Sequence, residues 1–126
     1  MNPASRIWKL AAGWAAVIFL LSSIPGRSFP QYKILSYDKV LHALVYSVLG
    51  GLVFLAVRRT WALKTSWLIG LSALLAVAYG LTDEFHQLFV PGRCADLQDA
   101  LADGIGGLFG AVVAAVLPVA RARGAP

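Results

Sequence analysis

The dominant pattern along the chain is four long apolar segments separated by short polar ones. The apolar segments cover residues 7–24, 39–57, 67–90 and 99–120. Each is close to the roughly 20 residues that an α-helix needs to cross the hydrocarbon core of a bilayer. The separating segments PGRSFP, RRTWALK and VPGR are rich in proline, glycine or charge, which end helices. The pattern predicts an all-α fold, a bundle of four transmembrane helices that forms one domain over residues 1–126.

The composition supports a membrane protein. Hydrophobic residues make up 59% of the 126 residues and charged residues 13%, whereas soluble domains have about 45–50% and about 25%. A soluble fold of this size could not bury so much apolar surface. The first segment could alternatively be a signal peptide, with Arg6 and Lys9 as its charged start. Its 18 residues and the lack of a small-x-small cleavage site favour a retained membrane anchor.

The distribution of charge predicts the orientation in the membrane. Basic residues concentrate in the cytoplasmic loops of membrane proteins. If both termini are cytoplasmic, that side carries seven bases and no acid: Arg6, Lys9, Arg58, Arg59, Lys64, Arg121 and Arg123. All six carboxylates then lie on the other side, together with the bases Arg27, Lys33, Lys39 and Arg93. We therefore expect a multi-pass cell-membrane protein with N-in, C-in topology and two extracytoplasmic loops.

The net charge of +5 does not indicate a nucleic-acid partner. The bases are scattered between long apolar segments and form no basic face, so we expect membrane lipids as partners and no nucleic acid.

The acids gather in polar clusters at the predicted outer ends of three helices. Four of the six lie in the single stretch LTDEFHQLFVPGRCADLQD, residues 81–99. Residues three or four apart share one face of a helix, so the polar residues form three stripes that continue into small residues. The stripes are Asp38, His42, Tyr46 and Gly50; Gln87, Asp83 and Tyr79, with Glu84 beside them and Gly80 and Ala76 below; and Asp96, Asp99, Asp103, Gly107 and Gly110. Because small residues let helices approach closely, we expect packing along the stripes to join the polar ends in one extracytoplasmic site.

Asp83 and Glu84 are the strongest candidates for a functional role. They lie in the last turns of their predicted helix, where the macrodipole disfavours carboxylates. They also lie near the outer edge of the hydrocarbon core, where an ionisable group indicates function. We expect Arg93 and Lys39 to compensate their charge.

A structural role is an equally good interpretation of three other acids. Each lies where a helix is predicted to begin, so its carboxylate can cap backbone N–H groups or interact with the positive end of the macrodipole. These acids are Asp38, Asp96 and Asp99.

The residue types in the clusters fit acid–base or ligand-binding chemistry. Asp83, Glu84 and His42 could transfer protons, because crowded carboxylates retain a proton near neutral pH. They could instead hold a divalent cation, although no spacing identifies a metal site or a cofactor, and His42 could simply be a packing residue. Arg93 could grip a phosphate or carboxylate through its planar guanidinium. The single cysteine, Cys94, excludes an internal disulfide and a four-cysteine zinc site.

Several short motifs, taken together, resemble the VanZ-like family of small membrane proteins. They are DKVLHALVY at residues 38–46, DEFHQ at 83–87, PGR at 91–93, Asp99, and GG at 106–107. Their order and spacing extend the resemblance over residues 20–115. The resemblance implies a four-helix integral membrane protein whose site residues are Asp38, Lys39, His42, Tyr46, Asp83, Glu84, Gln87, Arg93 and Asp99.

The resemblance also implies a link to the cell envelope. The family takes its name from a protein associated with low-level resistance to teicoplanin, a lipoglycopeptide antibiotic that acts at the outer face of the membrane. Family membership does not transfer that resistance to this chain. The chain departs from the family pattern twice, with Asp96 in place of a small hydroxyl residue and Asp103 in place of an asparagine.

Three functions are compatible with such a site. The first is binding of an envelope lipid, a lipid-linked envelope precursor or a lipoglycopeptide-like amphiphile, with a role in envelope or antibiotic tolerance. The second is a hydrolase or transferase acting on a lipid-linked substrate, although no nucleophile elbow, HExxH or phosphate loop is present. The third is a small proton- or ion-coupled transporter, against which stands the lack of an acid near the bilayer midplane. The glycine stripes could also support a homodimer.

Overall fold

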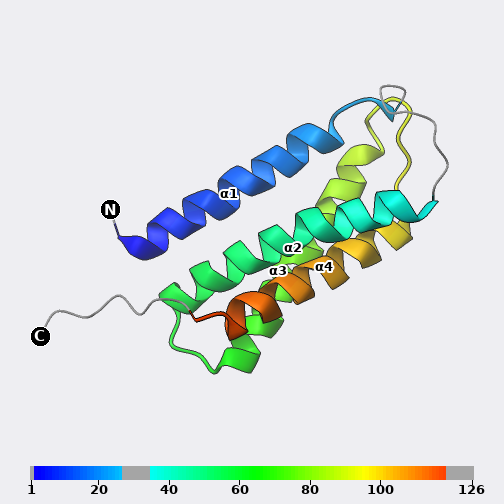
Figure 1. Cartoon of the computed structure of the whole chain (residues 1–126). Helices are drawn as coiled ribbons and strands as arrows, with labels where there is room; N and C mark the ends of the chain where they lie inside the picture. The colour runs from blue at the N-terminus through cyan, green and yellow to red at the C-terminus, as the bar shows by residue number, and fades with distance from the viewer. Residues whose placement is uncertain (1, 27–34, 119–126) are drawn as a thin grey trace, which may run out of the picture.

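The computed structural model describes residues 2–26 and 35–118, which form four α-helices (Figure 1). The helices are α1 (Pro3–Ser22), α2 (Leu35–Thr60), α3 (Thr65–Gln87) and α4 (Leu97–Val116). Each is long and apolar enough to cross a membrane, so the predicted all-α fold with four candidate spans is confirmed. Four bases used to predict the orientation lie outside the described residues: Arg27, Lys33, Arg121 and Arg123.

The helix ends follow local signals and differ by a few residues from the predicted bounds. α1 begins before residue 7 because Asn2 caps it: its Oδ1 accepts a hydrogen bond from the N–H of Ala4 at 3.0 Å. α2 extends beyond both predicted ends. α3 ends before residue 90, and the turn that follows contains Gly92, whose φ is 76°. α4 ends before residue 120, because Leu117 precedes Pro118 and a residue before proline avoids the helical region.

α2 is the central helix of the bundle (Figure 1). It has its most extensive contact with α4 and also contacts α1 and α3, and α3 packs against α4. The core between the helices includes Tyr46, Phe54 and Val57, each at most 1% exposed. Many leucine, valine and phenylalanine side chains on the outer faces are exposed, as expected for helices surrounded by lipid.

The two ends of the bundle differ in charge. At one end α1 and α3 finish and α2 and α4 begin; all six carboxylates lie in or near it, and we call it the acidic end. The opposite end carries Arg6, Lys9, Arg58, Arg59 and Lys64.

Glycine and alanine stripes bring α2, α3 and α4 into close contact, as predicted. A Cβ atom added to Gly50 would collide with the backbone of Gly107, and one added to Gly110 would collide with the backbone of Ser47. On the side of α4 that faces α3, a Cβ atom on Gly107 would collide with that of Ala76. These stripes are therefore used within one chain, so a homodimer would need another surface.

Gly110→Ala should destabilise the bundle, because the added methyl group has to displace the backbone of α2 at Ser47. Overpacking of this kind costs about 1–3 kcal/mol. Gly70→Ala is the matched control, since a Cβ atom there meets nothing within 4 Å. Thermal unfolding in detergent should show a lower midpoint for Gly110→Ala and an unchanged or higher one for Gly70→Ala. Equal midpoints would contradict the close packing of α2 on α4.

Candidate functional site

The outermost layer of the acidic end is an ion-pair network between α2 and α4. Nζ of Lys39 lies 3.0 Å from Oδ1 of Asp99 and 3.3 Å from Oδ2 of Asp96. The side chain of Lys39 is 27% exposed and that of Asp96 is 47% exposed, and ion pairs this exposed add little stability. The carboxylate of Asp99 is more sheltered, with 10% of its side chain exposed, and both pairs orient Lys39 at the beginning of α4.

Asp96 also caps α4, as predicted. Its Oδ1 accepts a hydrogen bond from the N–H of Gln98 at 2.8 Å. This hydrogen bond and the nearby Lys39 ammonium hold the pKa of Asp96 below its ordinary value. The N–H of Asp96 donates to Oε2 of Glu84 at 2.8 Å. A side chain of α3, that of Glu84, therefore completes the cap, while Asp99 lies in the first turn of α4.

A histidine–aspartate pair, with the histidine partly buried, lies inside this outer layer. Nδ1 of His42, on α2, lies 2.9 Å from Oδ1 of Asp103, on α4. Asp103 is fully buried, and Gly80 of α3 leaves space for its carboxylate, because a Cβ atom there would lie 2.9 Å from Oδ2. An ionised carboxylate selects the form of His42 that carries a proton on Nδ1. The carboxylate that orients His42 therefore comes from α4.

Glu84 joins this pair from α3. One carboxylate oxygen of Glu84, one of Asp103 and a ring nitrogen of His42 lie within 4.8 Å of one another; we call these three residues the inner cluster. Oε1 of Glu84 has no hydrogen-bond partner among the described residues, and neither have Oδ2 of Asp103 and the hydroxyl of Tyr46. Buried polar atoms are normally hydrogen-bonded. The buried oxygens of Glu84 and Asp103 therefore mark the inner cluster as a candidate ligand-binding site.

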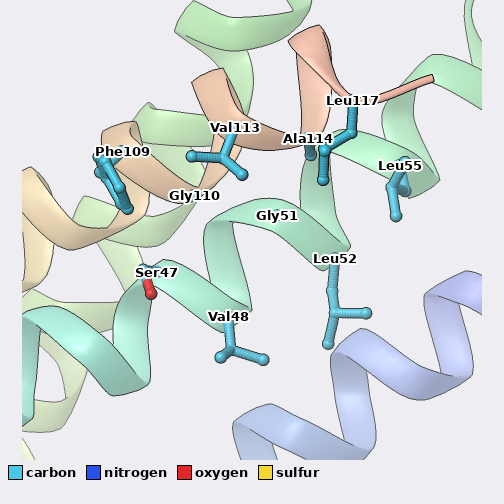
Figure 2. A pocket seen from close by; sticks show the side chains of 10 residues that line it. All are labelled: Ser47, Val48, Gly51, Leu52, Leu55, Phe109, Gly110, Val113, Ala114 and Leu117. Carbon is cyan, nitrogen blue, oxygen red and sulfur yellow. The ribbon is translucent and has the colours of Figure 1, made fainter. Parts of the chain in front are cut away.

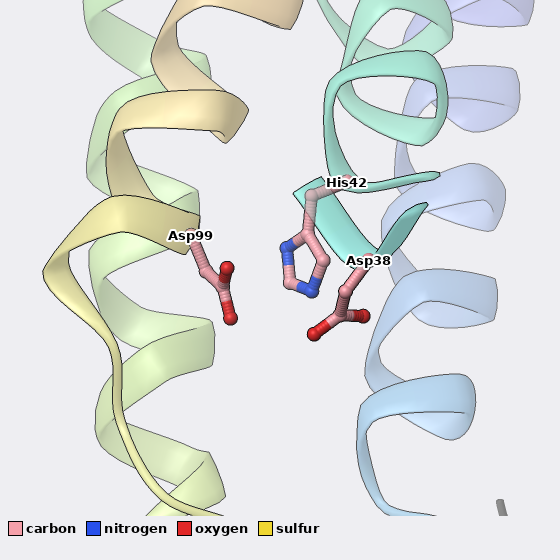
Figure 3. Close-up of side chains that lie close together, drawn as sticks. All are labelled: Asp38, His42 and Asp99. Carbon is pink, nitrogen blue, oxygen red and sulfur yellow. The ribbon is translucent and has the colours of Figure 1, made fainter. Parts of the chain in front are cut away.

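A second group of ligand-type side chains lies nearer the surface and shares His42. It consists of Asp38, His42 and Asp99, one atom of each lying within 4.8 Å of the others, and we call it the outer cluster. Figure 3 shows the ring of His42 between the two carboxylates. Since Nδ1 is bonded to Asp103, Nε2 is the ring nitrogen left for the outer cluster. His42 therefore links the exposed Asp38 to the buried Asp103.

Asp83 is bonded to α1, and Gln87 supports it from its own helix, α3. The hydroxyl of Ser22 donates to Oδ1 of Asp83 at 2.6 Å, and Nε2 of Gln87 donates to Oδ2 at 3.4 Å. Neutral donors thus satisfy both oxygens of Asp83. The prediction that Lys39 compensates Asp83 and Glu84 is wrong, because its ammonium lies with the acids of α4.

The last turn of α3 and the segment after it also contact the end of α1. Nε of Arg93 donates to the carbonyl of Ile24 at 3.2 Å. Nε2 of His86 lies 3.0 Å from the hydroxyl of Ser23, and its ring lies on that of Phe19 with the centroids 4.4 Å apart. Arg93 is therefore anchored on the α1 side of the acidic end, and its role as an anion ligand stays a prediction.

The predicted site residues fall into two groups. Those around the inner and outer clusters are Asp38, Lys39, His42, Tyr46, Glu84 and Asp99. In the second group, Asp83 and Arg93 contact α1 or the residues just after it, and Gln87 bonds Asp83 within α3.

Two residues outside the predicted set are central to the arrangement. Asp103 pairs with His42, and its four-residue spacing from Asp99 is a signal that could have identified it. Ser22 binds Asp83, but a serine near the end of an apolar segment carries no such signal.

An apolar groove runs along the outside of the contact between α2 and α4 (Figure 2). It has a volume of about 300 Å³. The side chains that line it include Val48, Leu52, Leu55, Phe109, Val113 and Leu117. Ser47, also in the lining, is five residues from His42 along α2, about 7.5 Å along the helix axis. The groove therefore begins within two helical turns of the inner cluster.

A comparison with known protein families gives a match over most of the chain. The model of the VanZ/LLP1 family matches residues 2–118, a range that includes all four helices. No curated protein and no solved structure matches the chain.

Ser22→Ala should destabilise the protein, because it removes the shorter of the two hydrogen bonds to the buried Asp83. A hydrogen bond to a charged group contributes about 1.5–3 kcal/mol. Ser47→Ala is the matched control, since the hydroxyl of Ser47 donates to a carbonyl of its own helix, that of Leu44. The free energy of unfolding in detergent should fall for Ser22→Ala and barely change for Ser47→Ala. An equal fall in both would refute the attachment of Asp83 to α1.

Proposed function

The chain belongs to the VanZ/LLP1 family, and from this membership and the geometry we propose that it binds the polar head of an envelope amphiphile at the acidic end. The ligand class comprises envelope lipids, lipid-linked envelope precursors and lipoglycopeptide-like compounds. In this proposal the acidic end faces the extracytoplasmic side of the cell membrane. The corresponding cellular role is in envelope or antibiotic tolerance.

The observation that carries the proposal is the layering of the acidic end. A charged rim that includes Lys39 and Asp96 is partly exposed and lies outside the inner cluster, whose two carboxylates are buried. The neighbouring faces of the helices are apolar and exposed, with Leu41 50% and Leu101 60% accessible. An amphiphile has the same division, a polar head beside apolar chains, so both of its parts would find a matching surface here.

The rim suits a head group that carries both an anion and hydrogen-bond donors. The ammonium of Lys39 can pair with a phosphate as a point charge. The carboxylates of Asp38 and Asp96 can accept hydrogen bonds from hydroxyl or amino groups. We include Arg93 as a second phosphate ligand, since a guanidinium binds such oxygens two at a time. A sugar or amino compound linked to a lipid phosphate has all of these groups.

The groove between α2 and α4 supports the same ligand class. It lies on the outer surface of two candidate spans and is lined mainly by aliphatic and aromatic side chains. An acyl or prenyl chain is the occupant that such a surface would meet in a bilayer. Because the groove begins near the level of the polar site, a single molecule could contact both.

Cys94 allows a direct test of the proposed orientation. It is the only cysteine in the chain, and it is exposed between α3 and α4. A membrane-impermeant maleimide should label it in intact spheroplasts. The control is the double variant Cys94→Ser, Ala62→Cys, which moves the single thiol to the exposed segment between α2 and α3. If only the control variant is labelled in intact spheroplasts, the segment between α2 and α3 faces outward, and the proposed orientation is contradicted.

Lys39→Met should weaken the binding of a polyprenyl-phosphate-linked sugar by roughly tenfold or more, because a hydrogen bond to a charged group contributes about 1.5–3 kcal/mol. Native mass spectrometry of the protein in detergent, titrated with this lipid, measures the affinity. Lys64→Met is the control, since it makes the same change at the opposite end of the bundle. Phosphatidylglycerol serves as the comparison lipid.

Stronger binding of the sugar lipid, lost in Lys39→Met and kept in Lys64→Met, would support the proposal. Equal binding of the two lipids, or equal affinity in the two variants, would contradict it.

The His42–Asp103 pair favours a second candidate function, hydrolysis or group transfer on a lipid-linked substrate. A carboxylate that fixes Nδ1 of a histidine leaves Nε2 to act as a general base. The two functions differ in how the lipid changes: an enzyme converts it in proportion to time, whereas a binding protein retains it in proportion to the amount of protein. Conversion that is lost in His42→Gln and kept in Asp83→Asn would favour the enzyme.

A further inference from the structure

The inner cluster brings together ligand-type side chains from three different helices. His42 comes from α2, Glu84 from α3 and Asp103 from α4, and one nitrogen or oxygen atom of each lies within 4.8 Å of the other two. Glu84 is 6% exposed and Asp103 is fully buried. Side chains that converge from packed helices are held in place before any ligand arrives, which favours a defined coordination site.

Two oxygen atoms in the inner cluster point to a cation. Oε1 of Glu84 and Oδ2 of Asp103 are buried and have no hydrogen-bond partner in residues 2–26 and 35–118. Two neighbouring carboxylates also repel each other in a site of low dielectric constant. A cation would satisfy the oxygens and remove the repulsion. We propose that His42, Glu84 and Asp103 bind a divalent transition-metal cation.

The donor set selects the class of metal. One imidazole nitrogen and two carboxylate oxygens suit Zn²⁺, and also Mn²⁺ and Fe²⁺. Ca²⁺ takes six to eight oxygen ligands, so a site with a histidine does not suit it. Three protein ligands leave at least one coordination position for a water molecule or a ligand oxygen.

The distance between His42 and Asp103 fits neighbouring ligands of one ion. Metal–ligand bonds of about 2.0–2.1 Å place adjacent ligand atoms about 2.9–3.4 Å apart in octahedral or tetrahedral geometry. Nδ1 of His42 and Oδ1 of Asp103 are 2.9 Å apart. The ligand oxygen of Glu84 lies within 4.8 Å of the ligand atoms of His42 and Asp103, and the N–H of Asp96 orients that carboxylate through Oε2.

The outer cluster is the weaker alternative. Its Asp99 is already paired with the ammonium of Lys39 at 3.0 Å, and its Asp38 is exposed. No buried oxygen of this cluster lacks a partner among the described residues. Asp38 and Asp99 nevertheless lie between the surface and His42 (Figure 3), so they could attract a cation on its way to the inner cluster.

Isothermal titration calorimetry tests the proposal directly. The protein, purified in detergent, freed of any affinity tag and stripped with EDTA, should bind one Zn²⁺ per chain, and Mn²⁺ more weakly because Mn²⁺ stands lower in the Irving–Williams order. Absence of binding by both ions at millimolar concentration would overturn the proposal.

Variants identify the ligands. Glu84→Gln and Asp103→Asn should each weaken Zn²⁺ binding at least about 100-fold, because changes that only touch a ligand's partner already cost about 10- to 100-fold. Asp83→Asn is the matched control: it neutralises the neighbouring carboxylate, which is bound to Ser22 and lies outside the inner cluster. Its affinity for Zn²⁺ should equal that of the wild type. If Asp38→Asn weakened Zn²⁺ binding and Glu84→Gln did not, the cation would bind at the outer cluster, and the proposal would be overturned.

A measurement on the wild-type protein keeps the proposal falsifiable if the variants fail to fold. Pulsed electron paramagnetic resonance of the Mn²⁺-loaded protein should show one directly coordinated imidazole nitrogen, that of His42. A spectrum without nitrogen coupling would overturn the assignment.

The cation site does not depend on the proposed amphiphile. The titration contains no added lipid, and Lys39→Met, which should weaken lipid binding, leaves all three metal ligands in place. Zn²⁺ affinity should therefore persist in that variant. Lipid binding without Zn²⁺ binding would contradict only the proposed cation site. Zn²⁺ binding without lipid binding would contradict only the proposed binding of an amphiphile.

Discussion

The close approach of the α2 and α4 backbones is the constraint on which the rest of the acidic end depends. Gly50 lies against Gly107, so no side chain separates the two helices at this level. The contact also defines how far one helix is displaced along the other. That displacement places His42 opposite Asp103, 61 residues away in the chain. If larger side chains separated the helices, the same residues would remain on the same faces but would no longer meet.

The protein satisfies its carboxylates in different ways at different depths. At the surface, Asp96 and Asp99 share the ammonium of Lys39. At the contact with α1, the buried Asp83 relies on neutral donors, chiefly the hydroxyl of Ser22. This arrangement avoids the cost of moving a second full charge out of water. The inner cluster differs from both, because two of its carboxylate oxygens are buried without a partner among the described residues.

His42 belongs both to the proposed metal site and to the proposed general base. A ring nitrogen of His42 lies within 4.8 Å of a carboxylate oxygen of each other member of both clusters. The outer cluster includes the exposed Asp38, and both carboxylates of the inner cluster are buried. A proton and a metal ion would compete for Nδ1 of His42, since a nitrogen that ligates a metal cannot carry a proton. A cation-bound inner cluster would therefore bind or polarise a ligand oxygen, whereas a cation-free one would leave His42 to act as a base. Both states are compatible with a polar head group held at the charged rim.

Hydropathy by itself was sufficient to predict the four helices, because crossing a bilayer requires about 20 apolar residues whatever the neighbouring helices are. The three- and four-residue spacings were sufficient to predict the polar stripes and the small residues below them. The stripes placed Asp38, His42 and Glu84 on the correct faces, and they predicted that α2, α3 and α4 pack along glycine and alanine. These features follow from the geometry of a single helix.

Only the tertiary structure decided which polar groups meet. In the folded chain Asp83 bonds Ser22 of α1, Lys39 pairs with the acids at the beginning of α4, and Asp103 is the partner of His42. Each of these pairs joins residues more than 50 positions apart. Helical periodicity determines the face on which a side chain lies, but the partner on another helix depends on the rotation and displacement of that helix. Those two quantities are set by the packing of all the side chains between the helices, and no local sequence pattern contains them.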